Sequence, residues 1–268
     1  MHIYIDTDTA NEVDDPYAVF RALVAPEVEV VGLSSESWMT SEPFADGTYA
    51  SHKMNKEVLE LTSLTQTVSC PLGALSRMPT RTTPVDSEAA RDIIAKAHQT
   101  PVGQKLPIFV LGCYTNVASA LLLDPSIKEK LSVCVMGYQF EDGWFSTEEW
   151  NCLGDPNAAE YLLESDVELF VMPQNLLRQW WWQKADVDAH FKGKGGIKDY
   201  LVQRWDTVSP EKSQRVLWDI AVFEAYLRPH LATLESVERG GRTVHVWTRI
   251  DEVGMQSDYW AATNAYGA

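Results

Sequence analysis

The sequence is poor in basic residues. It contains 22 Lys and Arg against 38 Asp and Glu among 268 residues, which gives a formal net charge of -16. Binding to phosphate backbones or to anionic lipid headgroups needs a basic surface, so this balance argues against nucleic acid and membranes as partners. It favours a small ligand that is neutral or cationic. Apolar runs of about 18 residues, the length of a membrane helix, are also absent from the sequence.

Cysteine is scarce and shows none of the spacings of a metal-binding or disulfide-rich protein. Cys70, Cys113, Cys134 and Cys152 form no C-x-x-C pair and mostly lie in or beside apolar runs. They are therefore predicted to be buried, reduced thiols. No basic segment followed by an apolar one, as in a secretory signal, precedes the strand-like residues that begin at His2. These features together predict a soluble, cytoplasmic protein.

Short apolar runs alternate with helical patterns over the first two thirds of the chain. Six runs have the length and β-branched content of strands, at 2–5, 28–34, 66–70, 107–112, 131–137 and 167–172. Helical periodicity fills the intervals, at 15–25, 47–62, 86–99, 116–123 and 156–164. This order predicts an α/β fold with an open, mostly parallel sheet and helices on both faces.

The last third of the chain has a different pattern. It is mainly helical, over 174–191, 199–208 and 215–227, and a final strand is predicted at 242–250. The predicted helix 174–191 contains three consecutive tryptophans, Trp180 to Trp182, of which at most one or two can share a helix face. With 45% hydrophobic residues and no linker or internal repeat, residues 1–268 are interpreted as one domain.

The stretch DTDTANEVDD, residues 6–15, places four aspartates and a glutamate directly after the first predicted strand. Ligands of open parallel sheets bind at the carboxyl ends of the strands, where this stretch lies. Capping of the following helix explains one carboxylate, that of Asp14 or Asp15. The others would repel one another unless a cation compensates them. Because all the donors are oxygens, the expected ion is hard, and a flexible cage of carboxylates and carbonyls suits Ca²⁺ better than Mg²⁺.

Polar groups are expected at other strand ends as well. The segment LGCYTN (111–116) follows the fourth predicted strand, and STEEWNCLGDP (146–156) follows the fifth. Farther along, Asp219 lies between Trp218 and Ile220 in an apolar helical pattern. A carboxylate among such neighbours is expected to be partly buried, and a buried charge must be paired or bound to a metal. A structural salt bridge or a helix cap is the alternative for Asp219.

Four short motifs follow one another along the chain. They are Asp6-Thr7-Asp8 with Asp14-Asp15, the segment GCYTN at 112–116, Glu149-Trp150-Asn151 followed by Asp155-Pro156 and Ala158-Ala159, and Trp218-Asp219. Each is weak alone, but four in this order over residues 3 to about 230 make a specific pattern. The pattern resembles that of the inosine-uridine type nucleoside hydrolases. The resemblance implies their α/β fold and hydrolysis of the N-glycosidic bond of a nucleoside.

The resemblance also implies roles for individual residues. The implied Ca²⁺ ligands are the carboxylates of Asp8, Asp15 and Asp219 and the backbone carbonyl of Leu111. The implied ribose ligands are Asp14, Glu149 and Asn151. Asp8 would act as the general base for a Ca²⁺-bound water, and the acidic surroundings would stabilise an oxocarbenium-like transition state. The implied substrate is a ribonucleoside or a related small N-riboside, and the implied assembly is a homo-oligomer, a dimer or a tetramer.

Two features depart from the family pattern. Five residues separate Asp8 from Asp14, where three are usual, but one branch has D-T-D-x-x-N-x-x-D-D at this turn, and Asn11 matches its asparagine. Asn11 is therefore a candidate ribose ligand, with a turn residue as the alternative. Trp218 replaces a histidine that helps the base to leave in some members. Its ring can stack on a base but cannot serve as a general acid, and a purely structural tryptophan is the alternative.

Two other interpretations stay open at this point. Asp6-Thr7-Asp8 after an apolar strand is similar to the start of a haloacid-dehalogenase-type phosphatase, although Ala10 stands where that family has Thr or Val. The other alternative is a catalytically silent nucleoside- or ribose-binding protein on the same fold. It is favoured because none of the six histidines lies in a matched motif, and disfavoured because the aspartates of the motifs are intact.

Overall fold

The computed structural model of the chain describes residues 1–38 and 43–267. Its centre is a seven-stranded sheet with the order β10-β11-β7-β4-β3-β1-β2. These strands are β1 (His2–Thr7), β2 (Glu29–Ser35), β3 (Leu106–Val110), β4 (Leu131–Met136), β7 (Glu168–Met172), β10 (Ala232–Arg239) and β11 (Arg242–Ile250). All neighbours run parallel except β10 and β11, which form an antiparallel hairpin. The predicted open, mostly parallel sheet is confirmed.

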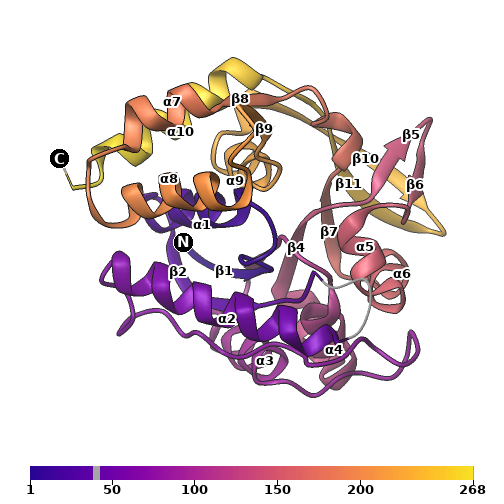
Figure 1. The fold of residues 1–268 in the computed structure, drawn as a ribbon. Coiled ribbons are helices and arrows are strands. Elements are labelled where there is room, and N and C mark those ends of the chain that lie inside the picture. Colours follow the sequence, from indigo (N-terminus) through magenta and orange to yellow (C-terminus); the bar gives the residue numbers. More distant parts are fainter. Residues whose placement is uncertain (39–42, 268) are drawn as a thin grey trace.

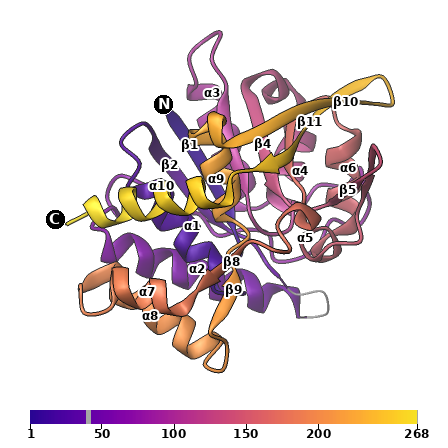
Figure 2. The same ribbon diagram turned by 90° about the horizontal axis from the view of Figure 1, so that it is seen from above.

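Helices cover both faces of the sheet, as Figures 1 and 2 show. One layer contains α1 (Asp14–Leu23), α7 (Lys184–Phe191), α8 (Gly196–Val208), α9 (Ile220–Leu227) and α10 (Glu252–Ala265). The other contains α3 (Glu88–Gln99), α4 (Thr115–Leu123) and α6 (Pro156–Glu164). The remaining elements are α2 (Phe44–Leu61) beside β2, the short α5 (Trp150–Gly154), and three 3-10 helices, η1 (Pro125–Lys130), η2 (Gln174–Leu176) and η3 (Pro229–Leu231).

Burial on both faces explains the composition of the central strands. Every residue of β3 and β4 is buried, which is why both read as continuous apolar runs rather than as alternating ones. The β10–β11 hairpin closes through Gly240 and Gly241, whose φ angles are +58° and +81°. Two successive positive φ values suit a tight hairpin turn and favour glycine at both positions.

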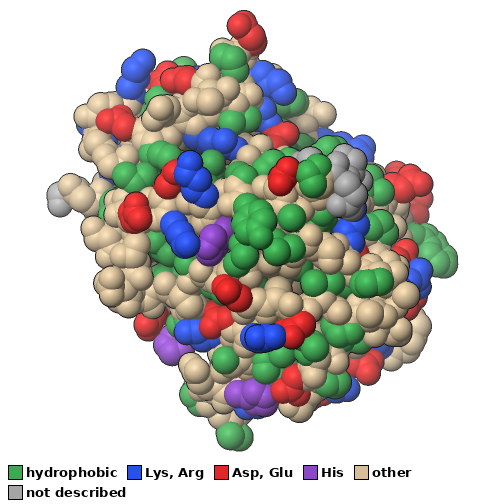
Figure 3. All heavy atoms as spheres, turned by 60° about the horizontal axis from the view of Figure 1, so that its bottom comes forward, with side chains coloured by type: hydrophobic (Ala, Val, Ile, Leu, Met, Phe, Trp, Pro, Cys, Tyr) green, Lys and Arg blue, Asp and Glu red, His purple; other side chains and the backbone are tan. Residues whose placement is uncertain are grey.

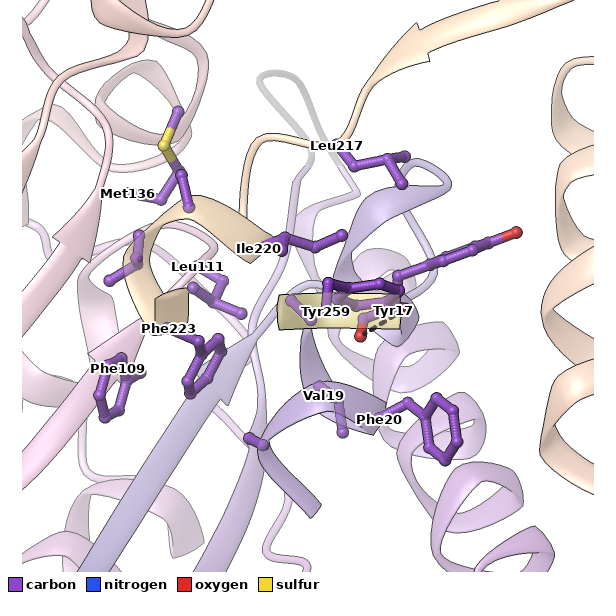
Figure 4. Packing of buried hydrophobic residues seen from close by; sticks show 14 of the residues in the cluster. Tyr17, Val19, Phe20, Phe109, Leu111, Met136, Leu217, Ile220, Phe223 and Tyr259 are labelled. Atoms are coloured by element: carbon purple, nitrogen blue, oxygen red, sulfur yellow. Dashed lines mark hydrogen bonds between the residues drawn. The ribbon is translucent and has the colours of Figure 1, made fainter. Parts of the chain in front are cut away.

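Aromatic contacts join the sheet to the helix layer of α1, α9 and α10. The ring of Phe109 on β3 stacks on that of Phe223 on α9, with centroids 4.3 Å apart (Figure 4). The Tyr259 hydroxyl of α10 donates a hydrogen bond of 3.3 Å to the Tyr17 carbonyl of α1 (Figure 4). These contacts fix α1 and α9 against the sheet, so the amino ends of both helices are held in place.

The surface carries charges of both signs. Figure 3 shows acidic and basic side chains interspersed with apolar ones on the face that it presents. In the described part of the chain, no helix combines the length and the apolar character that crossing a membrane requires. The four cysteines are free thiols, and Cys113, Cys134 and Cys152 are buried, as predicted. The prediction of burial is wrong for Cys70, which is only partly buried.

Two elements predicted from the sequence are wrong. Residues 66–70 form no strand, because Ser69 makes a single bridge to Gly32 at the edge of the sheet and does not continue the ladder. Asp219 does not lie within a helix that begins near residue 215. Residues Gln214–Val216 form the strand β9, and α9 begins after Asp219, which occupies its N-cap position.

The tryptophan run is also a strand and not a helix. Trp181–Gln183 form β8, which pairs with β9, whereas the predicted helix begins only at Lys184 as α7. The side chains of Trp180 and Trp182 are buried and that of Trp181 is 43% exposed. This alternation is the period of two expected of a strand. Trp180 and Trp182 pack edge to face in the core, and Trp182 also contacts Tyr259. A second small ribbon, β5 (Gln139–Glu141) with β6 (Trp144–Ser146), was not predicted.

Candidate active site

The carboxyl ends of β1, β3 and β4 and the amino ends of α1, α5 and α9 meet around one pocket. Its volume is about 260 Å³. Its lining consists of Asp8, Asn11, Glu12, Asp14, Asp15, Leu111, Met136, Glu149, Trp150, Asn151, Gln174, Trp218 and Asp219. Every candidate site residue from the sequence is in this set. The structure therefore brings together residues that are separated by more than 200 positions in the chain.

The acidic turn leads from β1 into α1. The N-cap of α1 is Val13, and it makes no side-chain capping bond, so capping does not explain the carboxylates of Asp14 and Asp15. The Thr7 hydroxyl donates to Asp15 Oδ1 at 2.6 Å. The Asn11 amide nitrogen Nδ2 donates to Asp8 Oδ2 at 3.1 Å, and the Asn11 backbone N–H donates to the Asp8 carbonyl at 2.7 Å. Asn11 thus closes the turn and orients the Asp8 carboxylate.

Three carboxylates converge at one wall of the pocket. Asp14, Asp15 and Asp219 each place an oxygen within 4.8 Å of the other two, and all three side chains are buried. Asp8 lines the same pocket and is 1% exposed. Asp219 reaches the group from the N-cap of α9, where it makes no side-chain capping bond. The helix-cap alternative for Asp219 is therefore wrong.

These carboxyl groups hold their protons more tightly than free aspartate. Burial raises the pKa of Asp14 to about 7, and the charge of Asp15 adds to the effect. Burial, followed by the charges of Asp14, Asp15 and Asp8, raises the pKa of Asp219 well above its usual range. The pKa of Asp8 is raised well above its usual range by burial and by Asp15. Both causes disfavour the ionised form when no counter-charge is present.

The cluster has the properties of a cation site. Within the described ranges, no ion pair joins a Lys or Arg side chain to the carboxylate of Asp8, Asp14, Asp15 or Asp219. Four buried carboxylates would be strongly unfavourable as ions unless a positive charge is placed among them. The donors are all oxygens, which suits a hard divalent cation. The residues present therefore fit a bound metal ion.

The start of α5 brings neutral and acidic hydrogen-bonding groups to the pocket. Glu149 is the N-cap of α5, and its Oε2 accepts bonds from the N–H groups of Asn151 and Cys152 at 3.0 and 3.2 Å. The Asn151 Nδ2 donates to the carbonyls of Leu111 (2.8 Å) and Met136 (3.1 Å). Both side chains are more than nine-tenths buried. Their positions are therefore set by the ends of β3 and β4.

Four pocket residues, of which Glu12 belongs to the acidic turn, are not among the site residues predicted from the sequence. Trp150 lies between Glu149 and Asn151, and its side chain is 51% exposed at the pocket. Gln174 follows the carboxyl end of β7, where the same strand-end argument could have found it. Met136 is the last residue of β4.

Trp218, which the sequence predicts as a contact for the base, is partly buried and lines the pocket. Among the described lining residues there is no histidine.

A second layer of polar residues supports the floor of the site. Asp6 Oδ1 accepts bonds from the Ser34 hydroxyl (2.5 Å) and the Asn116 amide (3.0 Å). Glu36, which follows β2, accepts the backbone N–H of Asn116 and the thiol of Cys113. Burial raises the pKa of Glu36 well above its usual range, and the charge of Asp6 adds to the effect. The sequence analysis missed Glu36 because a single acid after a strand carries little signal.

Other motif residues lie outside the pocket and have structural roles. Asp155 caps α6 through the N–H of Ala158 and accepts the Thr115 hydroxyl at 2.7 Å. Gly112 lies where a Cβ would be 2.8 Å from the Glu36 Cβ and 3.0 Å from the Asp8 Cβ. A larger residue at position 112 would separate the ends of β1, β2 and β3, so glycine permits the close approach.

Comparisons with known proteins agree with this geometry. The sequence profile of inosine-uridine preferring nucleoside hydrolases matches residues 3–262. A probable uridine nucleosidase 2 of Arabidopsis thaliana is 25% identical over 226 residues, which cover 76% of this chain and 68% of that protein. Among solved structures, a plant nucleoside hydrolase, the PpNRh1 enzyme, has a TM-score of 0.77 at 19% identity, covering 98% of this chain and 99% of its own.

A bacterial structure supports the same fold. The inosine-uridine preferring nucleoside hydrolase from Bacillus anthracis has a TM-score of 0.71 at 20% identity and covers 98% of both chains. At such identities the structural likeness establishes the fold, whereas the sequence profile spans nearly the whole chain. The chain therefore belongs to the inosine-uridine preferring nucleoside hydrolase family and is an N-ribosyl hydrolase.

Proposed function

We propose that the protein hydrolyses the N-glycosidic bond of a ribonucleoside, or of a related N-riboside, with Ca²⁺ in the acidic cluster and Asp8 as the general base. The single observation that carries the proposal is the set of four buried carboxylates on one pocket wall without a basic partner among the described residues. Such a set is unfavourable in a merely structural role, because among the described residues no ion pair with a Lys or Arg side chain compensates the buried charges.

The proposed metal ligands are the carboxylates of Asp8, Asp15 and Asp219 and the carbonyl of Leu111. When bound, Ca²⁺ would supply Lewis acidity that lowers the pKa of the attacking water. Asp14 belongs to the same tight group of carboxylates, and we assign it a ribose hydroxyl as its partner. Oxygen ligands in a flexible turn suit Ca²⁺ better than the smaller and more demanding Mg²⁺.

Asp8 is the proposed general base. Its Oδ2 accepts a hydrogen bond from Asn11, which holds the carboxylate in one orientation at the pocket. Burial and the charge of Asp15 raise the pKa of Asp8, and a bound cation would act in the opposite direction and keep the carboxylate ionised, as a general base must be. Asp8 would therefore take the proton from water as the oxygen attacks the anomeric carbon.

Glu149 and Asn151 would bind the sugar from the start of α5. Because the Asn151 Nδ2 is engaged with two carbonyls, its Oδ1 is the atom that we expect to accept a ribose hydroxyl. The acidic groups that line the pocket would stabilise the positive charge that develops on the ribose as the bond breaks. Asn11 adds a further proposed contact from the turn.

Trp218 is the proposed contact for the base. Its indole can stack on a heterocycle but offers no proton at neutral pH. Departure of the base then depends on stacking and on protonation by solvent, or on a substrate with a good leaving group. This favours N-ribosides that are more reactive than common purine nucleosides.

The test is release of free ribose from purine, pyrimidine and modified nucleosides, with p-nitrophenyl riboside as an activated control, in Ca²⁺ and in EGTA. Turnover of a natural nucleoside that is lost in EGTA is the expected result. Turnover of the activated riboside alone would support the Ca²⁺ site and Asp8 as the base. It would restrict the substrates to ribosides with a good leaving group. Silence on every substrate, with Ca²⁺ and ribose still bound, would replace the proposal with a binding protein.

Two further expectations accompany the proposed function. We propose that residues 1–268 unfold as one domain and that the chain forms a homodimer or homotetramer in the cytoplasm. Sedimentation equilibrium of the purified protein measures the assembly directly. A single monomeric species at micromolar concentration would contradict the oligomer, and two separate calorimetric transitions would contradict the single domain.

A further inference from the structure

Arg204 of α8 reaches the outer side of the acidic turn. Its Nη2 donates to the carbonyls of Ala10 (2.7 Å), Glu12 (2.8 Å) and Asn11 (3.3 Å), and its Nε donates to the carbonyl of Glu12 at 3.0 Å. Arg204 is not among the residues that line the pocket. One side chain therefore binds three consecutive carbonyls of the five-residue segment between Asp8 and Asp14.

Those carbonyls belong to a turn that is two residues longer than the usual family spacing. Residues 9–13 belong to neither β1 nor α1, so their backbone is held by contacts outside the regular elements. Among these contacts, the Ala10 N–H donates to Ser51 Oγ of α2 at 3.5 Å, and the bonds from Arg204 hold the carbonyls of residues 10–12. Holding such a segment in one conformation costs about 1–2 kcal/mol per residue in backbone entropy. The planar guanidinium offers several donors in a rigid fork, which suits a row of carbonyls better than a single ammonium does.

The position of Arg204 is itself fixed by packing. On α8, the neighbouring Trp205 is buried and packs edge to face against Tyr17 of α1, with centroids 6.4 Å apart. The Tyr17 hydroxyl donates to the Leu201 carbonyl of α8 at 2.8 Å. Helix α8 is thus docked on α1, the helix that carries Asp14 and Asp15. Arg204 connects the turn to the same rigid unit.

The charge of Arg204 opposes the binding of a cation. Burial lowers the pKa of Arg204, and the nearby charges of Asp15 and Asp14 act in the opposite direction. The positive charge of Arg204 therefore acts on the carboxylates of Asp14 and Asp15. By charge alone, removal of Arg204 would make the cluster more attractive to Ca²⁺. By position alone, removal would release the turn and weaken binding.

We propose that Arg204 is a positioning residue that holds the segment 9–13, and through it the carboxylates of Asp8 and Asp15, in the arrangement that binds the metal ion. The inference rests on the proposed function, because it takes the acidic cluster as the Ca²⁺ site. It assigns a role to a residue that contacts neither the sugar nor the base.

The test measures Ca²⁺ affinity by calorimetry in Arg204→Gln and Arg204→Lys. Both variants are expected to bind Ca²⁺ at least about tenfold more weakly, as is typical when a residue that orients a metal ligand is lost. Arg204→Gln distinguishes the two effects. If only the positive charge mattered and the turn stayed ordered, its removal would tighten Ca²⁺ binding. Affinity equal to or tighter than wild type in Arg204→Gln would overturn the proposal.

Two control variants distinguish the proposed role of Arg204 from general effects of substituting a residue of its kind or its helix. Arg228→Gln removes an arginine that pairs with Glu27 and Asp258 away from the pocket, and Gln203→Ala alters the exposed neighbour on α8. Both are expected to bind Ca²⁺ as wild type does. Thermal unfolding identifies any variant that does not fold, and Arg204→Lys, which keeps the charge, then carries the test.

A second measurement does not depend on the metal. Amide hydrogen exchange in the segment 9–13 is expected to be at least about tenfold faster in metal-free Arg204→Gln than in metal-free wild type. Unchanged exchange would overturn the proposal that Arg204 holds the segment 9–13, even if Ca²⁺ binding fell. If wild type binds no Ca²⁺, the proposed function fails, whereas the exchange result still decides whether Arg204 holds the turn.

Discussion

Helices α1 and α9 pack against each other, with acidic side chains at the amino ends of both. A further acid, Glu224, lies toward the carboxyl end of α9, and only there is the charge balanced. At the amino ends, Asp14, Asp15 and Asp219 converge without a basic ion-pair partner among the described residues. Toward the carboxyl ends, the fully buried Arg21 of α1 contacts Glu224 of α9 at 2.6 Å.

The balanced end forms an extended ion-pair network. Arg21 also contacts Asp258 of α10 at 2.6 Å, and Asp258 contacts Arg228 at 2.7 Å. Each acid there faces a guanidinium. At the acidic end the partial positive charges of two helix amino termini favour carboxylates, but they supply only about half a charge each. The ion-pair network therefore stabilises the fold, whereas the carboxylate cluster at the amino ends needs a bound cation to balance its charge.

The largest expected effect is on catalysis, at the unbalanced end. Asp8→Asn should lower kcat by at least about 10³-fold, because it removes the proposed general base. In EGTA its stability should not fall, since one of several mutually repelling carboxylates is neutralised. Ribose release and thermal unfolding measure the two effects. Glu60→Gln, an exposed acid on α2, is the control. Turnover of Asp8→Asn near that of wild type would exclude Asp8 as the base.

The opposite pattern is expected at the balanced end. Arg21→Met should destabilise the protein by about 3–5 kcal/mol, because buried Glu224 loses its partner. Ca²⁺ affinity of the folded variant should be unchanged. Urea unfolding and calorimetry test the pair of statements. Wild-type stability of Arg21→Met would show that the ion-pair network does not stabilise the fold. A tenfold change in its Ca²⁺ affinity would show that the two ends do not act independently.

Removal of the metal should affect stability through the unbalanced end alone. At Ca²⁺ a hundred times above its dissociation constant, binding should add about 2.7 kcal/mol to the free energy of unfolding. EGTA should abolish this gain in wild type, and Asp15→Asn should show a much smaller gain at the same Ca²⁺ concentration. Unfolding curves with and without Ca²⁺ measure it. A Ca²⁺ gain in Asp15→Asn equal to that of wild type would place the ion elsewhere.

The last expected effect is a pH dependence at the balanced end. Burial raises the pKa of Glu224 to about 7, although Arg21 acts to lower it. The folded chain therefore binds this proton more tightly than the unfolded chain, so stability falls as pH rises from about 4.5 to 7, by at most about 1.4 kcal/mol per pH unit. Glu224→Gln should remove this slope when compared with wild type in saturating Ca²⁺. Equal slopes would show that Glu224 stays ionised.

Much of the fold was predictable because local signals agree with it. The runs at 107–112 and 131–137 have the composition of strands buried on both faces, and they are β3 and β4. The strand predicted at 242–250 is β11 with the same limits. The run 66–70 has a similar composition, but it lies beyond the edge of the sheet, and a β-branched composition does not reveal whether a pairing strand is present.

The C-terminal third shows where local signals fail. Trp180 to Trp182 read as part of a helix because apolar residues around them recur at helical spacing. Pairing with β9, about 30 residues later, decides that Trp181 and Trp182 form a strand. For the same reason the helical pattern predicts too early a start for α9 and places Asp219 inside the helix, whereas Asp219 stands at the helix N-cap.

The chemistry that is available follows from the amino-acid sequence. The order of short motifs identified the family, and the excess of carboxylates after the first strand required compensation, because like charges repel wherever the turn lies. Only the tertiary structure decided which charges are compensated. Asp219 joins Asp14 across more than 200 residues, whereas Arg21 neutralises Glu224 and Arg204 binds the turn from α8. These pairings depend on distance and burial, which helix docking on the sheet sets and which spacing along the chain does not encode.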